Sequence, residues 1–344
     1  MSAALTIIMP AWNAEKTIEY AVRSVLSQTY RDLRLIVVDD GSTDETAAIL
    51  TRLAAEDARL TPMRVANGGP AKARNLALDA LDEKTRYVMF IDADDVLLPD
   101  AAEKALREAE AGAALVLLGF SILTTDGAKR DYCEPTQRLK RDELGGALGR
   151  LYKANLLNQV WGKLFSAELI RAENIRFPDY RWGEDRLFVF ACLERAGQIS
   201  VLEDCLYRYV MSEGESLISK YYDKKFAVCR EIDARMEAMC RELGVTDERD
   251  FRYMFAKSVF SCLTVLYAPS CPLNERQRRE AAREIVTDER VRRRCRDCSG
   301  GLPVNALCAV LQTGKPDLAL AVFRSVAWTS KAAPGLFTKL KHRK

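Results

Sequence analysis

Three carboxylates that follow an apolar segment are the side chains of this chain best suited to chemistry. The apolar residues 87–91 lead directly into Asp92, Asp94 and Asp95. Unpaired charges at the end of a buried strand are costly to desolvate, so such a cluster needs a compensating ligand. Alternating carboxylates offer hard oxygen ligands for Mg²⁺ or Mn²⁺, which take further ligands from a phosphate and from water. The alternative is that one carboxylate only caps a helix that begins near Pro99.

Histidine and cysteine chemistry has little support in this sequence. The only histidine, His342, lies in the tail, which argues against Ser-His-Asp and Cys-His catalysis in the folded body. Of the ten cysteines, only Cys295 and Cys298 form a close pair, and this CRDC motif lacks the further ligands of a structural zinc site. Several others lie in apolar helical contexts, which fits reduced thiols in a reducing compartment.

The composition is that of an ordinary soluble globular protein, with 48% hydrophobic and 29% charged residues. The length of 344 residues suggests two domains. The formal net charge of +3 is not strongly basic, so we expect no nucleic-acid partner. The first residues, MSAALTIIMP, have no basic n-region, and the longest apolar run, 113–123, is shorter than the roughly 20 residues that span a bilayer. The sequence thus predicts a cytoplasmic chain.

Short apolar runs alternate with segments of helical spacing through the first half of the chain. This alternation predicts an α/β fold, Rossmann-like, with a mostly parallel sheet flanked by helices. The informative loops each follow the C-terminal end of a strand, where ligands bind in such sheets, so we expect one shared cleft. The expected strands are residues 5–9, 33–38, 86–91 and 114–122, with a further short strand that ends at residues 64–65. The expected helices include residues 14–27, 71–81 and 99–111.

The remainder, residues 211–344, has a mostly helical pattern and is predicted to form a separate C-terminal region. Residues 218–268 have the pattern of two long helices, and residues 275–298 have that of an Arg-rich helix with a solvated face. From Pro316 an apolar helix leads into a basic tail that ends at Lys344. This segment either docks on a core, with a frayed end, or makes a peripheral contact with anionic lipid at the inner face of the cell membrane.

Five ordered motifs resemble those of the family 2 glycosyltransferases. They are IIMPAWNAEKTIEYAVRSVLSQTY (7–30), LIVVDDGSTDETAAIL (35–50), NGGPAKARNLAL (67–78), FIDADDVLLPD (90–100) and GEDRLF (183–188). The resemblance implies a GT-A fold and a catalytic domain over residues 1–210. The helical remainder has a looser resemblance to accessory regions of bacterial cell-surface polysaccharide transferases. The resemblance further implies a UDP-sugar donor and Mn²⁺ or Mg²⁺ as cofactor.

The family pattern implies a nucleotide site formed by the loops after the first two strands. Pro10 and Trp12 belong to this site. The ring of Trp12 would stack on uracil, and the alternative is that it packs under the first helix. Asp40 would accept the N3–H of uracil. The alternative there is an Asx-type turn cap, which Asp39 or Ser42 could equally supply.

Gly68 and Arg74 complete the nucleotide site that the resemblance implies. Gly68 and Gly69 would let the backbone approach a phosphate at a helix N-terminus; without the resemblance they are simply a loop. The planar guanidinium of Arg74 would reach the base or the diphosphate.

The acidic turn and a later pair of acids would then carry the chemistry. Asp92 would serve both nucleotide and metal, Asp94 would coordinate the ion directly, and Asp95 would orient the other two. Inverting members of the family use a carboxylate at the position of Glu184 and Asp185 as general base, and we choose Asp185, with Glu184 second. The alternative is that both acids only favour a helix dipole.

The resulting hypothesis is an inverting, metal-dependent glycosyltransferase that acts on a glycan or lipid-linked acceptor. Trp182 and Lys163 are predicted to contact this acceptor. The alternative for Lys163 is that residues 155–166 only form a strand and a turn beneath the site. A nucleotidyltransferase is less favoured, because the loop PAWNAEKT after the first strand lacks the glycine of a phosphate loop. A non-catalytic nucleotide-sugar or glycan-binding protein on the same scaffold is the remaining alternative.

Overall fold

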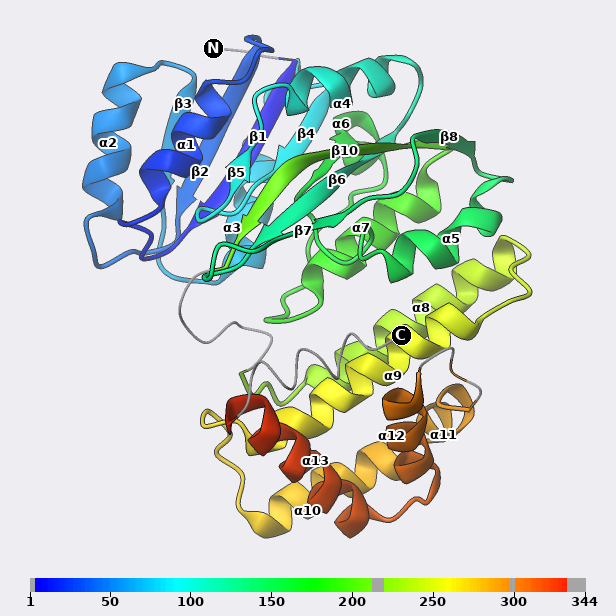
Figure 1. Ribbon diagram of the computed structural model, residues 1–344. Helices are drawn as coiled ribbons and strands as arrows, with labels where there is room; N and C mark the ends of the chain where they lie inside the picture. Colours follow the sequence, from blue (N-terminus) through cyan, green and yellow to red (C-terminus); the bar gives the residue numbers. More distant parts are fainter. Residues whose placement is uncertain (1–3, 212–219, 297, 299–300, 333–344) are drawn as a thin grey trace. The chain divides into compact units, whose positions relative to one another are not determined.

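A ten-stranded mixed sheet is the scaffold of the first part of the chain (Figure 1). The computed structural model describes residues 4–211, 220–296, 298 and 301–332, and the chain divides into two compact units, Met1–Glu213 and Gly214–Lys344. The strands are β1 (Leu5–Ala11), β2 (Leu33–Asp39), β3 (Leu60–Arg64), β4 (Tyr87–Phe90), β5 (Val96–Leu97), β6 (Leu115–Leu123), β7 (Lys129–Tyr132), β8 (Gln137–Lys140), β9 (Lys163–Ser166) and β10 (Gln198–Val210).

The strands β3, β2, β1 and β4 are parallel neighbours in that order. They are rich in apolar residues, such as LTIIMPA in β1, as expected for strands that are buried on both faces. Leu5, Ile7 and Ile8 of β1 are fully buried. Because these strands run in one direction, the loops after them meet at one edge of the sheet. This arrangement confirms the predicted α/β fold.

The strand β9 is the main departure from a parallel sheet. It lies between β4 and β6 and is antiparallel to both. The strands β6 and β10 are parallel to each other, whereas β5, β7 and β8 are antiparallel to their partners. Since β9 runs against β4, the residues that precede β9 lie at the same edge as the residues that follow β4.

Helices cover both faces of this sheet (Figure 1). The helix α3 packs against β1 and β2, and α4 packs against β6 and β9. The helix α4 has Asp100 as N-cap residue, without a side-chain hydrogen bond. The alternative that an acid of the turn 92–95 caps this helix is therefore wrong. The helices are α1 (Ile18–Leu26), α2 (Thr46–Glu56), α3 (Pro70–Asp79), α4 (Ala101–Glu110), α5 (Leu144–Lys153), α6 (Ala167–Ala172) and α7 (Glu184–Arg195).

The described part of the second unit is helical. The helices α8 and α9 correspond to the two long helices that the pattern predicts, and they pack together. The single Arg-rich helix expected over 275–298 is instead two helices, because Asp288 ends one and caps the next by accepting the backbone N–H of Val291 at 3.0 Å. The helices are α8 (Lys225–Glu242), α9 (Arg249–Thr264), the 3₁₀ helix η2 (Val265–Tyr267), α10 (Glu275–Thr287), α11 (Glu289–Arg294), α12 (Leu302–Gln312) and α13 (Pro316–Ala332).

The helix α13 packs against α9 and α10. Leu320 and Phe323 are buried in this contact region, whereas Trp328 is 70% exposed. This packing supports the docking interpretation of the apolar segment. The basic tail, residues 333–344, lies outside the described residues. None of the helices that the structure describes has both the length and the apolar character needed to cross a bilayer.

A third thiol, that of Cys308, lies close to those of the CRDC motif. The Sγ atoms of Cys298 and Cys308 are 3.6 Å apart, and Cys298 Sγ also donates to the carbonyl of Arg294 at 3.7 Å. The described residues nevertheless contain no group of three or more His, Cys, Asp or Glu side chains that could hold a metal ion.

Candidate functional site

The loop after β1 presents an aromatic ring at the edge where the parallel strands end. Trp12 is 59% exposed, so its ring is not packed in the core. The backbone N–H of the next residue, Asn13, donates to Ser42 Oγ at 3.0 Å and ties this loop to the loop after β2. Pro10 lies within β1 itself, paired with Val38. The ring of Trp12 is thus free to stack on a planar ligand beside the end of β2.

Asp40 holds the glycine loop that follows β3. Its Oδ1 accepts the backbone N–H of Gly68 at 2.7 Å, and its Oδ2 accepts that of Gly69 at 2.8 Å. Gly69 has a φ of +91°, a conformation that favours glycine, and α3 begins at the next residue. The Asx-type contact comes from Asp39, whose Oδ1 accepts the backbone N–H of Ser42 at 2.9 Å. Both glycine N–H groups are therefore engaged by Asp40 rather than directed at a phosphate.

Arg74, in α3, joins the most distant parts of this edge. Its Nη2 donates to Asp92 Oδ1 at 2.8 Å, and its Nη1 donates to Asp185 Oδ1 at 2.8 Å. Nη1 also lies 3.7 Å from Glu184 Oε1. Arg74 is only 4% exposed. Burial opposes its charge, but the carboxylates of Asp185, Asp92 and Glu184 outweigh burial and raise the pKa of Arg74.

The acidic turn after β4 gives its carboxylates different environments. Asp95 is fully buried, where its Oδ2 accepts the hydroxyl of Tyr207 at 2.5 Å and its Oδ1 accepts the backbone N–H of Val210 at 2.9 Å. Asp92 faces Arg74. Burial, and then the charge of Asp92, raise the pKa of Asp94 to about 6. Burial and the neighbouring acids also raise the pKa of Asp95. The turn therefore carries more negative charge than its surroundings neutralise.

This donor set fits a hard divalent cation that takes most of its ligands from elsewhere. Asp95 is engaged by Tyr207 and by the backbone of β10, so Asp92 and Asp94 are the carboxylates of the turn that could serve as ligands. Two carboxylates do not make a complete cage, in agreement with the absence of a metal-holding cluster from the described residues. Mg²⁺ is usually held by one or two carboxylates together with substrate phosphates and water. The excess of negative charge at the turn favours such an ion.

Glu184 and Asp185 form the first turn of α7 and have a buried setting. Asp185 Oδ2 accepts the backbone N–H of Val160 at 3.4 Å, in addition to the bond from Arg74 to Oδ1. Burial, and then the charge of Asp185, raise the pKa of Glu184 to about 7. Burial also raises the pKa of Asp185, against the opposing charge of Arg74. Both acids also suit the helix N-terminus. Their location in α7 alone therefore does not decide between a general base and acids that only favour the helix dipole.

The two residues predicted to contact an acceptor differ in exposure. Trp182 is partly exposed, and the guanidinium of Arg186 lies 5.7 Å from the centroid of its ring. Lys163 is 1% exposed, and its Nζ donates to the carbonyl of Trp161 at 3.3 Å. Trp182 therefore has surface with which a ligand can make contact, whereas Lys163 lies beneath the surface.

Two aromatic residues support this arrangement and were not predicted from the sequence. Tyr207 donates to Asp95 and accepts the backbone N–H of Asp92 at 3.2 Å, which fixes the acidic turn to β10. Phe177 lies under the guanidinium of Arg74, 5.5 Å from ring centroid to Cζ. Asn75 holds Phe177 by two hydrogen bonds to its backbone, of 2.8 and 2.9 Å. The only sequence signal is the position of Asn75 beside Arg74 in the motif ARN.

The family described as Glycosyl transferase family 2 matches residues 6–159 of this chain. The putative teichuronic acid biosynthesis glycosyltransferase TuaG of Bacillus subtilis is 31% identical over 235 residues, which are 67% of this chain and 88% of that protein. The uncharacterized glycosyltransferase EpsJ of the same organism is 30% identical over 210 residues. That match covers 60% of this chain and 60% of EpsJ, so it spans less than two thirds of that relative.

Among solved structures, residues 1–349 of Staphylococcus aureus TarS in complex with UDP-GlcNAc match this fold. The TM-score is 0.66 at 22% sequence identity, over 94% of this chain and 91% of that chain. The same part of TarS has also been solved with UDP. The likeness extends over both units and confirms the expectation of a GT-A sheet followed by a helical C-terminal region.

Proposed function

Because this chain belongs to the family 2 glycosyltransferases, we propose that it transfers a sugar from a UDP-sugar to a hydroxyl acceptor, with inversion of the anomeric centre. The observation that carries this proposal is the guanidinium of Arg74, which bonds Asp92 of the acidic turn and Asp185 of α7. The buried guanidinium of Arg74 thereby holds Asp92, which would bind the donor and its metal ion, close to Asp185, which would act on the acceptor hydroxyl. Direct displacement needs both functions at one place.

Asp185 is the proposed general base and takes the proton of the attacking hydroxyl. It has two fixed contacts, to Arg74 and to the backbone of Val160, which hold its carboxylate in one orientation. Glu184 lies farther from the guanidinium, at 3.7 Å, and is the second choice. A positioned base contributes about 10²–10⁴-fold to the rate.

Trp12, Asp40 and Arg74 form the proposed nucleotide grip. Trp12 supplies the exposed ring for base stacking, and Asp40, which also holds the backbone of Gly68 and Gly69, would accept the N3–H of uracil. Asp92 and Asp94 are the residues that would hold Mg²⁺ or Mn²⁺. When bound, the ion supplies electrostatic stabilisation of the leaving diphosphate.

The proposed donor and acceptor classes rest on relatives rather than on the geometry. TarS was solved with UDP-GlcNAc and with UDP, which supports a UDP-sugar donor here. The name of TuaG refers to teichuronic acid biosynthesis, which supports a glycan or lipid-linked acceptor in cell-surface polysaccharide synthesis. We assign the transfer to residues 1–210 and an accessory role to the helical region 211–344, in the cytoplasm. The tail 333–344 would make a peripheral contact at the inner face of the membrane, and its deletion should then weaken binding to anionic vesicles.

Nucleotide binding and turnover together test the proposed function. Calorimetry with UDP, GDP and dTDP, each with and without Mn²⁺, should show metal-dependent binding of UDP that Asp94→Ala weakens at least tenfold. Asp126→Ala, a change at an exposed acid of the turn before β7, serves as the matched control. Incubation with UDP-sugars and glycan acceptors should release UDP. Binding of UDP without any release would favour the non-catalytic alternative, and no binding of any nucleotide would contradict the proposal.

A further inference from the structure

A buried lysine lies beneath the proposed base and has no role in the mechanism described so far. Lys163 is the first residue of β9, in the middle of the sheet, and is 1% exposed. An ammonium group in such a place is costly to desolvate unless an opposite charge compensates it. In the described contacts its Nζ has one hydrogen-bond partner, the carbonyl of Trp161 at 3.3 Å. One bond leaves two of its three donors unused.

The packing of β9 against α7 indicates which charge compensates that of Lys163. Residues two apart in a strand share a face, so Lys163 and Phe165 point to the same side of the sheet. The ring of Phe165 lies 5.5 Å from that of Phe188 in α7. Asp185 precedes Phe188 by three residues and therefore shares its helix face. Lys163 therefore lies on the side of the sheet that faces α7. Asp185 Oδ2 also accepts the backbone N–H of Val160, three residues before Lys163, which places the carboxylate of Asp185 near the start of β9.

The electrostatics of the two groups agree with this geometry. Burial lowers the pKa of Lys163 to about 7, and the one charge that opposes this shift is that of Asp185. The interaction is mutual, since the charge of Lys163 lowers the pKa of Asp185. Arg74 differs from Lys163, because its guanidinium interacts with three carboxylates, those of Asp185, Asp92 and Glu184.

We infer that Lys163 is a positioning residue, whose positive charge acts on Asp185 and keeps this carboxylate ionised. Arg74 cannot do this alone, because it also pairs with Asp92. The inference rests on the proposed function of Asp185. It assigns Lys163 to the base rather than to the acceptor, because a side chain that is 1% exposed has almost no surface for an acceptor to contact. The groups that face this pair are Glu184 of α7, Arg74 of α3 and, through Arg74, Asp92 of the acidic turn.

The competing explanation is that Lys163 only fills space beneath the site. Lys225 offers a matched control, because it is also a buried lysine, 2% exposed, whose pKa is lowered by burial and whose Nζ donates to Ser261 Oγ at 2.8 Å. It belongs to α8 of the C-terminal unit, outside the proposed site. The changes Lys163→Met and Lys225→Met remove the same charge from two buried sites and keep a similar length of side chain.

The first measurement is the pH profile of kcat/KM for the wild type and both variants. Without the ammonium, Asp185 should be harder to ionise, so the acidic limb should move upward by about one pH unit in Lys163→Met. The value of kcat should fall at least tenfold, while the affinity for UDP changes less than threefold. Lys225→Met should keep the wild-type limb. An unchanged limb in Lys163→Met would overturn the inference, even if the variant were less active.

A second measurement does not depend on turnover. The ¹³C resonance of the Asp185 carboxyl, assigned by its loss in Asp185→Asn, can be titrated in the wild type and in Lys163→Met. The titration of Asp185 should move to higher pH in the variant, and an unchanged titration would contradict the inference. If Lys163→Met does not fold, Lys163→Gln, which keeps a polar group for the carbonyl of Trp161, replaces it in both experiments. A wild type without transfer activity would instead count against the proposed function, and the titration would still decide the role of Lys163.

Discussion

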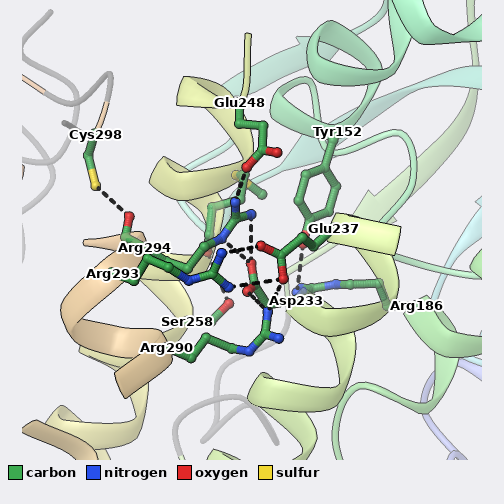
Figure 2. Close-up of polar contacts among 11 residues, drawn as sticks. Tyr152, Arg186, Asp233, Glu237, Glu248, Ser258, Arg290, Arg293, Arg294 and Cys298 are labelled. Atoms are coloured by element: carbon green, nitrogen blue, oxygen red, sulfur yellow. Dashed lines mark hydrogen bonds and ion pairs between the residues drawn. The ribbon is translucent and has the colours of Figure 1, made fainter. Parts of the chain in front are cut away.

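Each unit of this protein buries a cluster of charged side chains, and the two clusters differ in their balance of charge. In the N-terminal unit, the cluster contains five carboxylates but only one guanidinium and one ammonium, and three of the carboxylates pair with the guanidinium. In the C-terminal unit, three carboxylates face three arginines (Figure 2). The first cluster, the site cluster, contains Asp92, Asp94, Asp95, Glu184, Asp185, Arg74 and Lys163. The second, the helix cluster, contains Asp233, Glu237, Glu248, Arg290, Arg293 and Arg294.

The charged side chains of the helix cluster form ion pairs with one another. Asp233 accepts from Arg294 Nη2 at 2.9 Å and from Arg290 Nη1 at 2.7 Å, which joins α8 to α11 (Figure 2). Hydrogen bonds from Arg293, and then from Arg290, lower the pKa of Glu237 to about 2. In the site cluster, by contrast, the pKa of Glu184 rises to about 7. A balanced cluster fixes helices, whereas an unbalanced one retains charge that a ligand can complete.

The largest effect is expected where the site cluster would carry out proton transfer. Asp185→Asn keeps the size of the side chain but removes the base, so the rate of transfer should fall about 10²–10⁴-fold. The affinity for UDP should stay the same or increase, because Arg74 loses a competing partner. Initial rates of UDP release and calorimetry measure the two quantities, with Asp126→Asn as control. Turnover at the wild-type rate would move the role of base to Glu184 or elsewhere.

A large loss of stability is expected where the helix cluster is opened. Arg294 is 1% exposed, and Arg294→Met would leave Asp233 buried without its main partner. Removing one member of a buried ion pair costs about 3–5 kcal/mol. Arg293→Met is the control within the same cluster, because the side chain of Arg293 is 56% exposed and an exposed pair is worth only about 0.2–1 kcal/mol. Urea unfolding of both variants tests the difference, and equal losses would show that burial does not decide the outcome.

The sequence predicts the scaffold of the site well because the signals are local. Apolar runs mark the buried strands, and the family motifs place Arg74, Asp92 and Asp185 on loops and helix starts that the fold brings to one edge. The contact of Arg74 with Asp92 agrees with the parallel order of β1 and β4, whereas its contact with Asp185 depends on where α7 packs.

The supporting residues could not be predicted, because their contacts depend on pairing between distant segments. Tyr207 reaches Asp95 only through the register of β10, which shifts twice along β6 at irregularities. The position of Lys163 depends on β9 being antiparallel between β4 and β6, which no local pattern indicates. The use of Asp40 to hold Gly68 and Gly69 likewise requires the pairing of β2 with β3.

The smallest effect is also the sharpest test of the comparison, because Asp94 of the site cluster and Glu237 of the helix cluster should respond with opposite sign. The pKa of Asp94 is raised from 3.8 to about 6, so its ionisation opposes folding and stability falls as the pH rises through this range. Since Asp94 is partly exposed, screening reduces the effect to about 1 kcal/mol. At pH 7, Asp94→Asn should therefore be more stable than the wild type by about this amount.

Glu237→Gln supplies the opposite arm of this test. The pKa of Glu237 is lowered from 4.5 to about 2, so its ionisation favours folding, and this contribution is lost as the pH falls through that range. At pH 7 the variant should be less stable than the wild type, and the difference should shrink toward pH 2. Urea unfolding at several pH values measures both variants. If Asp94→Asn were also destabilising at pH 7, the site cluster would be closed by its own residues, and the charge that is proposed to attract a divalent cation would not exist.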